Sequence, residues 1–279
     1  MTNFLKRSIT GLVYVVLLFG SLFAGKATFG LFFLLITFAG MREFYLLVSR
    51  NGIYPQVWPG IAAGFSLFLV IFLFFSGYVN ATILFLPFVF LPAFFLLELF
   101  RNKETPVQNI GITLLGVAYV ALPVSLINVL VFPFSHSAGF YSPDILAGLY
   151  ILIILNDTVA YIVGVPFGKH RLMERISPKK SWEGMFGGVI ATLVAGYFMT
   201  HLFPFLDLRQ WFILALIVSV FGTLGDLAES MLKRSMKIKD SGSLLPGHGG
   251  ILDRLDALLF VVPVAVFYLY YSGLKYTLP

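Results

Sequence analysis

The residues best suited to chemistry lie between positions 225 and 256 of this 279-residue sequence. Asp226, Glu229, Ser230, Lys233 and Arg234 are spaced so that they fall on one face of a helix. Their neighbours are apolar, and a charged side chain at membrane depth costs roughly 3 kcal/mol even on lenient insertion scales. This stripe of carboxylates and cations therefore indicates a functional site suited to cation-assisted phosphate chemistry.

A second pair of carboxylates, Asp253 and Asp256, stands at the start of the next predicted helix, where the helix dipole favours negative charge. The two helices are expected to be antiparallel neighbours, so that Asp226 and Asp253 face each other. Converging carboxylates repel unless a cation lies between them. Because the chain contains no cysteine, its oxygen ligands favour Mg²⁺, with one or two cations bound. Asp226 and Asp253 are the predicted metal ligands.

The loop between these helices is rich in glycine over residues 247–250. Glycine allows backbone amides to approach phosphate oxygens closely. The alternative interpretation is a salt-bridged helical hairpin in which Lys233 and Arg254 neutralise the acidic stripe. That interpretation accounts neither for the glycines nor for so many charges in a chain that otherwise avoids them.

A lone intramembrane carboxylate, Asp157, follows Asn156 inside another apolar segment. Tyr161 lies one helical turn further on, so it shares a face with Asp157. The pattern predicts a site residue at Asp157. A polar contact between helices, with Asn156 as the bridging side chain, is the alternative.

The basic segment 177–184 carries Lys179 and Lys180 just before a predicted helix. Ser181 is the predicted N-cap of that helix, which leaves free backbone N–H groups and a positive dipole beside the two lysines. Such a helix start binds anions readily. A juxtamembrane patch that holds anionic lipid headgroups is the alternative.

The elements that must position these residues are transmembrane helices, because 59% of the chain is hydrophobic and only 11% is charged. Since a bilayer core needs about 20 mostly apolar residues per helix, we expect an all-α polytopic bundle of about nine spans. They lie near residues 9–25, 27–48, 57–77, 81–100, 107–132, 144–166, 184–206, 210–232 and 252–274. Only Lys26 separates the first two, so a tight hairpin and a total of seven or eight spans stay open. A signal peptide is the alternative for residues 1–25, but the apolar segments that follow at once favour an uncleaved first span.

The distribution of basic residues predicts the orientation. With nine spans, sixteen of the 19 Lys and Arg residues fall on the side of the N-terminus, and three fall on the other side. The positive-inside rule makes the richer side cytoplasmic. We therefore expect a multi-pass protein of the cytoplasmic (inner) membrane, with its N-terminus and site on the cytoplasmic face.

The two halves of the chain differ in kind. Residues 1–140 are nearly all apolar and predict scaffold helices, whereas the polar clusters lie within residues 141–279, the predicted catalytic region. The net charge of +6 suits an anionic membrane surface better than nucleic acid in so apolar a chain.

The polar pattern resembles the signature of the phosphatidate cytidylyltransferases, also called CDP-diglyceride synthases. Every element of that signature is present at its spacing: Ser230, Lys233, Arg234, Lys239, Asp240, Gly242, Leu245, Pro246, His248, Gly249, Gly250, Asp253, Arg254 and Asp256. The segments around Asp157 and 177–184 also look like family features. The resemblance covers residues 150–279 closely and the N-terminal half only as a hydrophobic bundle.

The resemblance implies that CTP and phosphatidate react to give CDP-diacylglycerol and pyrophosphate. The implied catalytic residues are Asp226, Asp253, Lys233, Arg234 and Asp157. The implied substrate-binding residues are Lys179, Lys180, Ser230, Lys239, Asp240, His248, Gly249, Gly250, Arg254 and Asp256. The implied partners are CTP, phosphatidate and membrane lipid; a homodimer is among the assemblies left open.

Two other functions compete with this one. A CTP-dependent kinase of lipid alcohols would need a base for the hydroxyl, a role open to Asp157 or His248. A secondary transporter would use intramembrane carboxylates for ion coupling, but the charges here lie at helix ends rather than at the bilayer midplane.

Overall fold

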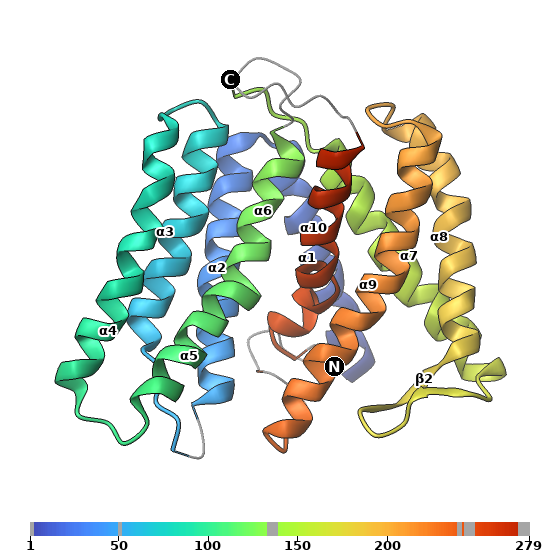
Figure 1. The fold of residues 1–279 in the computed structure, drawn as a ribbon. Coiled ribbons are helices and arrows are strands. Elements are labelled where there is room, and N and C mark those ends of the chain that lie inside the picture. Colours follow the sequence, from blue (N-terminus) through green and yellow to red (C-terminus); the bar gives the residue numbers. More distant parts are fainter. Residues whose placement is uncertain (1–2, 50–51, 133–138, 239–241, 243–248, 273–279) are drawn as a thin grey trace.

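The computed structural model describes residues 3–49, 52–132, 139–238, 242 and 249–272. Helices dominate these residues and pack side by side in one bundle (Figure 1). In chain order the helical segments are α1 (Asn3–Phe23), α2 (Lys26–Val48), α3 (Val57–Phe75), η1 (Ala81–Val89) with α4 (Phe90–Arg101), α5 (Pro106–Gly116) with η2 (Val117–Ala121) and α6 (Leu122–Val131), α7 (Asp144–Phe167), α8 (Trp182–Leu202), α9 (Leu208–Ser235) and α10 (Leu252–Tyr271).

The predicted membrane bundle is confirmed. Among the described residues, seven segments are long and apolar enough to cross a membrane: Lys26–Val48, Val57–Phe75, Ala81–Arg101, Pro106–Val131, Asp144–Phe167, Trp182–Leu202 and Leu208–Ser235. The apolar part of α1, Ile9–Phe23, is shorter, and α10 carries charged residues in its first turns. With α1 and α10 the total agrees with about nine spans. The chain is a multi-pass membrane protein.

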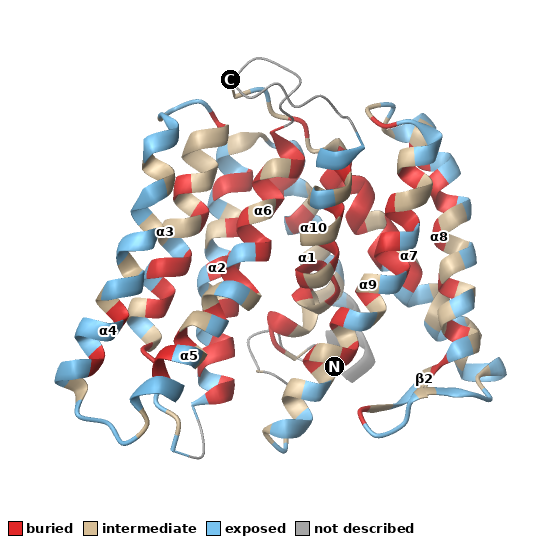
Figure 2. Ribbon diagram, viewed as in Figure 1, coloured by how far each residue is buried: buried red, intermediate tan, exposed pale blue. Residues whose placement is uncertain are grey.

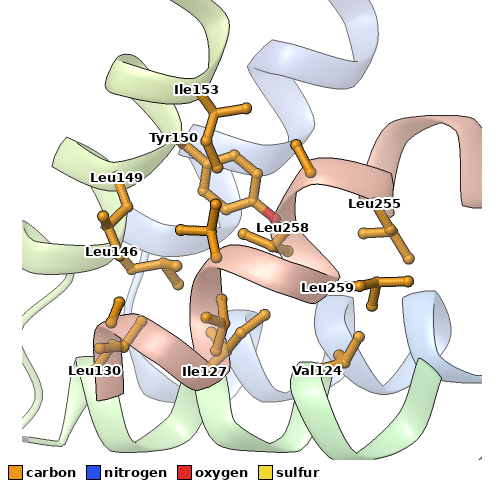
Figure 3. Close-up of a cluster of buried hydrophobic side chains, with 14 of the residues drawn as sticks. Val124, Ile127, Leu130, Leu146, Leu149, Tyr150, Ile153, Leu255, Leu258 and Leu259 are labelled. Carbon is orange, nitrogen blue, oxygen red and sulfur yellow. The ribbon is translucent and has the colours of Figure 1, made fainter. Parts of the chain in front are cut away.

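The core lies between the helices, and their outer faces are apolar but exposed (Figure 2). Side chains of α6, α7 and α10 interlock in its centre, among them Ile127, Leu149 and Leu258 (Figure 3). Phe100 is 87% exposed and Phe85 is 73% exposed, an arrangement expected where lipid rather than water is the solvent.

A short β-hairpin interrupts the helices between α7 and α8, where the sequence predicted only a loop. Its strands β1 (Arg171–Met173) and β2 (Ser177–Ser181) pair antiparallel, with Arg171 opposite Ser181. The extended backbone before Pro178 agrees with the restriction that proline places on the preceding residue. This hairpin holds Lys179 and Lys180 at the end of the bundle where α7 ends and α8 begins (Figure 1).

Candidate active site

Three carboxylates converge where α9 passes α10. Asp226, Glu229 and Asp256 have ligand oxygens within 4.8 Å of one another. Gly225 makes this convergence possible, because a Cβ there would overlap the backbone carbonyl of Asp256 and lie 3.2 Å from the Cα of Ala257. The close approach of the two helices therefore places Asp226 beside Asp256.

Two lysines neutralise part of this acidic cluster. Lys180 of the hairpin forms an ion pair with Asp226. Lys233 lies between two carboxylates, with its Nζ 2.6 Å from Glu229 Oε2 and 2.6 Å from Asp253 Oδ1. The salt bridges that the alternative interpretation expected thus exist in part, with Lys233 as their centre.

The predicted ligand pair of Asp226 and Asp253 stays a prediction. In the structure Asp253 pairs with Lys233 and accepts a hydrogen bond from the Gly250 backbone N at 2.8 Å. Gly249, at φ +84°, adopts a conformation that an L side chain rarely takes, and a Cβ there would overlap Asp253 Oδ2. Asp253 therefore orders the end of the glycine-rich loop, while Asp256 and Glu229 lie closest to Asp226.

The cluster fits a divalent cation. Counting Glu229 and Lys233 with the lining of the larger cavity, five carboxylates (Asp157, Asp226, Glu229, Asp253, Asp256) face five cations (Arg171, Lys179, Lys180, Lys233, Arg254). The site as a whole carries no formal net charge, so a metal ion would be held locally by the three clustered carboxylates. Glu229 is 2% exposed, and its Oε1 is buried without a hydrogen-bond partner among the described residues. A buried carboxylate oxygen without a donor is costly unless it is paired. All-oxygen ligands suit Mg²⁺, Ca²⁺ or Mn²⁺.

The hairpin and the start of α8 place basic side chains and a helix N-terminus beside the same cluster. Ser181 is the N-cap of α8, as predicted, and its Oγ accepts a hydrogen bond from Gly184 N at 3.2 Å. Glu183 accepts from the backbone N of His170 at 3.1 Å, which ties the hairpin to the helix. Lys179 is exposed and Lys180 is half-buried. Among the described residues an ion pair is found for Lys180 but not for Lys179.

Asp157 lies across the site on α7. Asn156 donates a hydrogen bond from Nδ2 to Asp157 Oδ1 at 3.3 Å, and its Oδ1 packs 2.6 Å from where a Cβ of Gly188 would stand. Asn156 thus serves the helix contact that was the alternative for this segment, while Asp157 remains available to the site.

Two cavities meet at the charged residues. The larger, about 660 Å³, opens beside the hairpin and is lined by Tyr161, Lys179, Lys180 and Asp226 among others. The smaller, about 170 Å³, lies against α1 and α7 and is lined mainly by apolar groups. Asp157, Asp253, Arg254 and Asp256 line both. Ligands in the two cavities would therefore meet at these four side chains.

A contributor that the sequence reasoning missed is Glu43 of α2. It is 2% exposed and accepts a hydrogen bond from Ile251 N at 2.7 Å, across 208 positions of sequence. A Cβ at Gly242 would lie 2.8 Å from its carboxyl carbon. Glu43 thus lies against two described points of the segment between α9 and α10, Gly242 and Ile251. Its position inside an apolar span was the available signal.

The remaining predicted residues lie at the margin of the site or outside the described part. Ser230 is half-buried on α9, and Arg234 is exposed at its end, where Nη1 donates to Ile238 O at 3.4 Å. Lys239, Asp240 and His248 lie outside the described residues.

The fold and the site define a class: a multi-pass membrane protein with a cluster of carboxylates and cations at one end of its helices. The sequence model of the Cytidylyltransferase family matches residues 5–272. The chain belongs to this family, and it is a nucleotidyltransferase that uses CTP.

Two relatives agree with the chain over nearly its whole length. A "Phosphatidate cytidylyltransferase" of Staphylococcus haemolyticus is 34% identical over 263 residues, which cover 92% of this chain and 96% of the relative. The protein of that name from Staphylococcus saprophyticus is 33% identical, with the same coverage of 92% and 96%. A third, from Staphylococcus epidermidis, is 46% identical over 117 residues, or 41% of this chain and 45% of the relative.

Proposed function

We propose that the chain condenses CTP with phosphatidate to form CDP-diacylglycerol and pyrophosphate in phospholipid biosynthesis. The observation that carries this proposal is the meeting of two cavities at Asp157, Asp253, Arg254 and Asp256. Only the larger cavity is also lined by Arg171, Lys179 and Lys180, which suit the phosphates of a nucleotide, whereas the smaller one is lined by apolar side chains of α1 and α7 that suit a lipid. The names of the relatives supply the two substrates.

The reaction is an in-line displacement at phosphorus. A phosphate oxygen of phosphatidate forms a bond to the α-phosphorus of CTP, and the bond from that phosphorus to the bridging oxygen breaks as pyrophosphate leaves. The attacking phosphate is already anionic, so no side chain has to remove a proton. Catalysis then depends on positioning and on neutralising charge.

The chain's own cations carry that work in this proposal. Lys179, Lys180 and Arg254 line the larger cavity and hold triphosphate oxygens. Lys233, held by Glu229 and Asp253, is positioned to contact the lipid phosphate. Arg234 serves the outer phosphates at the exposed end of α9.

Mg²⁺ is the proposed cofactor. Asp226, with Asp256 and Glu229, would hold it, and Asp253 would order the loop beside it and keep Lys233 in place. When bound, the ion would screen the triphosphate and stabilise the leaving pyrophosphate. The proposal includes one or two bound cations.

The proposed location is the cytoplasmic face of the cell inner membrane. Its support is the excess of basic residues at the site's end of the bundle. CTP arrives from the cytoplasm, whereas phosphatidate keeps its acyl chains in the bilayer. Residues 141–279 form the proposed catalytic region, and residues 1–140 form mainly scaffold, with Glu43 and part of α1 at the site. A homodimer is among the assemblies compatible with this proposal, and we propose no nucleic-acid partner.

The test is to incubate the purified full-length chain with CTP, phosphatidate and Mg²⁺. We expect equal amounts of pyrophosphate and CDP-diacylglycerol. In a parallel incubation with a polyprenol in place of phosphatidate, release of CDP with formation of the polyprenyl phosphate would replace the proposal with a kinase. Ion flux into proteoliposomes without CTP turnover would replace it with a transporter.

A further inference from the structure

A cavity on the opposite flank of the bundle from the hairpin combines guanidinium groups with apolar walls. It has a volume of about 490 Å³ and lies where α2 ends, α3 begins and α4 ends. Arg42 and Arg101 line it together with Gln56, Trp58, Leu46 and Leu97. These helix ends lie at the same end of the bundle as the α9–α10 site (Figure 1).

A buried hydrogen-bond network builds the inner wall of this cavity. Glu98, 5% exposed, accepts from Gln56 Nε2 at 2.7 Å, from Asn109 Nδ2 at 2.8 Å and from Arg101 Nη1 at 2.7 Å. The backbone N of Gln56 donates to Thr113 Oγ1 at 2.8 Å. These contacts hold the Gln56 side chain and the Arg101 guanidinium in place.

Gln56 leaves one acceptor without a partner. Its Nε2 also donates to the Phe94 carbonyl oxygen at 2.8 Å. Because both neighbours of Nε2 are acceptors, the amide cannot be turned around. Gln56 is 2% exposed, and its Oε1 is buried without a hydrogen-bond partner in the described part of the chain. This oxygen has almost no accessible surface, so Gln56 belongs to the rigid inner wall that holds Arg101 and does not itself contact a ligand.

The charge of the cavity is a single positive one. Glu98 offsets Arg101, which still has unused N–H donors after its bonds to Glu98 Oε2 at 2.7 Å and to Pro55 O at 3.4 Å. Arg42 is exposed, and no ion pair to it is found among the described residues. One net positive charge with guanidinium donors matches a phosphodiester, which carries one negative charge.

The apolar rim shows how the ligand reaches the cavity. Trp58 is 68% exposed and Leu46 is 52% exposed beside the guanidinium groups. Tryptophan is enriched at membrane interfaces, where its ring lies at headgroup level. Acyl chains can thus lie along Leu46 and Leu97 while the headgroup enters the cavity.

We propose that this cavity, separate from the α9–α10 site, binds an anionic glycerophospholipid. In it Arg42 and Arg101 hold the phosphodiester. Phosphatidylglycerol has the single net negative charge that matches this cavity. Phosphatidylcholine has no net charge.

The experiment is native mass spectrometry of the full-length chain in detergent, titrated with phosphatidylglycerol or with phosphatidylcholine. We expect the unchanged protein to retain phosphatidylglycerol preferentially. Arg42→Gln should lose one tightly bound phosphatidylglycerol, with its dissociation constant raised about tenfold, which is the usual effect of one charge-assisted contact. Arg209→Gln is the matched control, because Arg209 is an exposed arginine at the start of α9, the end of that helix away from the active-site residues.

Arg42 is exposed, so its variant should unfold at the unchanged temperature, which separates lost binding from lost folding. Equal retention of phosphatidylglycerol by the Arg42→Gln and Arg209→Gln variants would overturn the proposal. So would equal retention of the two lipids by the unchanged protein. A third arm adds inorganic phosphate alone. Displacement of the bound lipid by millimolar phosphate would overturn the lipid assignment and point to a site for free phosphate.

Discussion

Neutralising Asp256 and neutralising Asp253 should have different effects on the requirement for Mg²⁺. Asp256 belongs to the group of three carboxylates whose oxygens lie within 4.8 Å of one another. Asp253 instead pairs with Lys233 at 2.6 Å and with Gly250 N at 2.8 Å. Asp256→Asn therefore removes a charge from the proposed cation site, whereas Asp253→Asn removes a charge from the groups that hold Lys233 and the loop.

The magnitudes follow from these contacts. A charge-assisted contact is worth about 1.5–3 kcal/mol, and about 1.4 kcal/mol corresponds to a factor of ten. Asp256→Asn should raise the half-saturating Mg²⁺ concentration about 10- to 100-fold on this basis. Asp253→Asn should lower the free energy of unfolding, and raise the activation free energy of turnover, by a similar amount of about 1.5–3 kcal/mol. It should leave the half-saturating Mg²⁺ concentration close to that of the unchanged protein.

The assay is pyrophosphate release at saturating CTP and phosphatidate over a series of Mg²⁺ concentrations, with thermal unfolding of each variant alongside. Asp144→Asn is the matched control, because Asp144 lies in the first turn of α7, at the far end of that helix from Asp157. An unchanged Mg²⁺ requirement in Asp256→Asn together with a raised one in Asp253→Asn would refute this reasoning. It would favour the pair Asp226 and Asp253.

Three other changes test how the site is assembled. Glu43→Gln should weaken the hydrogen bond from Ile251 N, destabilise the loop by about 1–2 kcal/mol and lower turnover. Glu104→Gln, at an exposed position, should change neither the unfolding temperature nor pyrophosphate release. Equal behaviour of the two variants would count against a role for Glu43. Gly225→Ala should separate α9 from α10 at a cost of about 1–3 kcal/mol and abolish most turnover. Gly111→Ala is the control, because a Cβ there would meet nothing within 4 Å, and it should leave stability and turnover unchanged. An active Gly225→Ala protein of normal stability would contradict the close approach of α9 and α10. A chelator should stop turnover and lower the unfolding temperature, since a ligand that binds the folded state stabilises it. Mg²⁺ should restore both, and turnover that persists in excess chelator would exclude a metal requirement.

Several features of this protein follow from local sequence. The polar stripe from Asp226 to Arg234 and the N-cap at Ser181 were predictable, because helix periodicity and capping depend on residues within about one or two turns. Span positions were predictable because each helix must satisfy its own backbone in lipid. The tight connection of α1 to α2 was among the alternatives that the short spacing around Lys26 left open.

Tertiary contacts decided the rest. The sequence places Asp253 and Asp256 equally well at the start of a helix, and only the crossing of α9 and α10 at Gly225 turns Asp256 towards Asp226 and Asp253 towards Lys233. The β-hairpin depends on cross-strand pairing that no helical period reveals.

The polar cluster at 226–256 was thus readable as a site from its residue types and spacing alone. Which carboxylates meet within it was not, and neither was the contact of Glu43 with a loop 208 positions away. The physical reason is that spacing determines which side chains share a helix face, whereas the closest approach of two helices determines which faces touch.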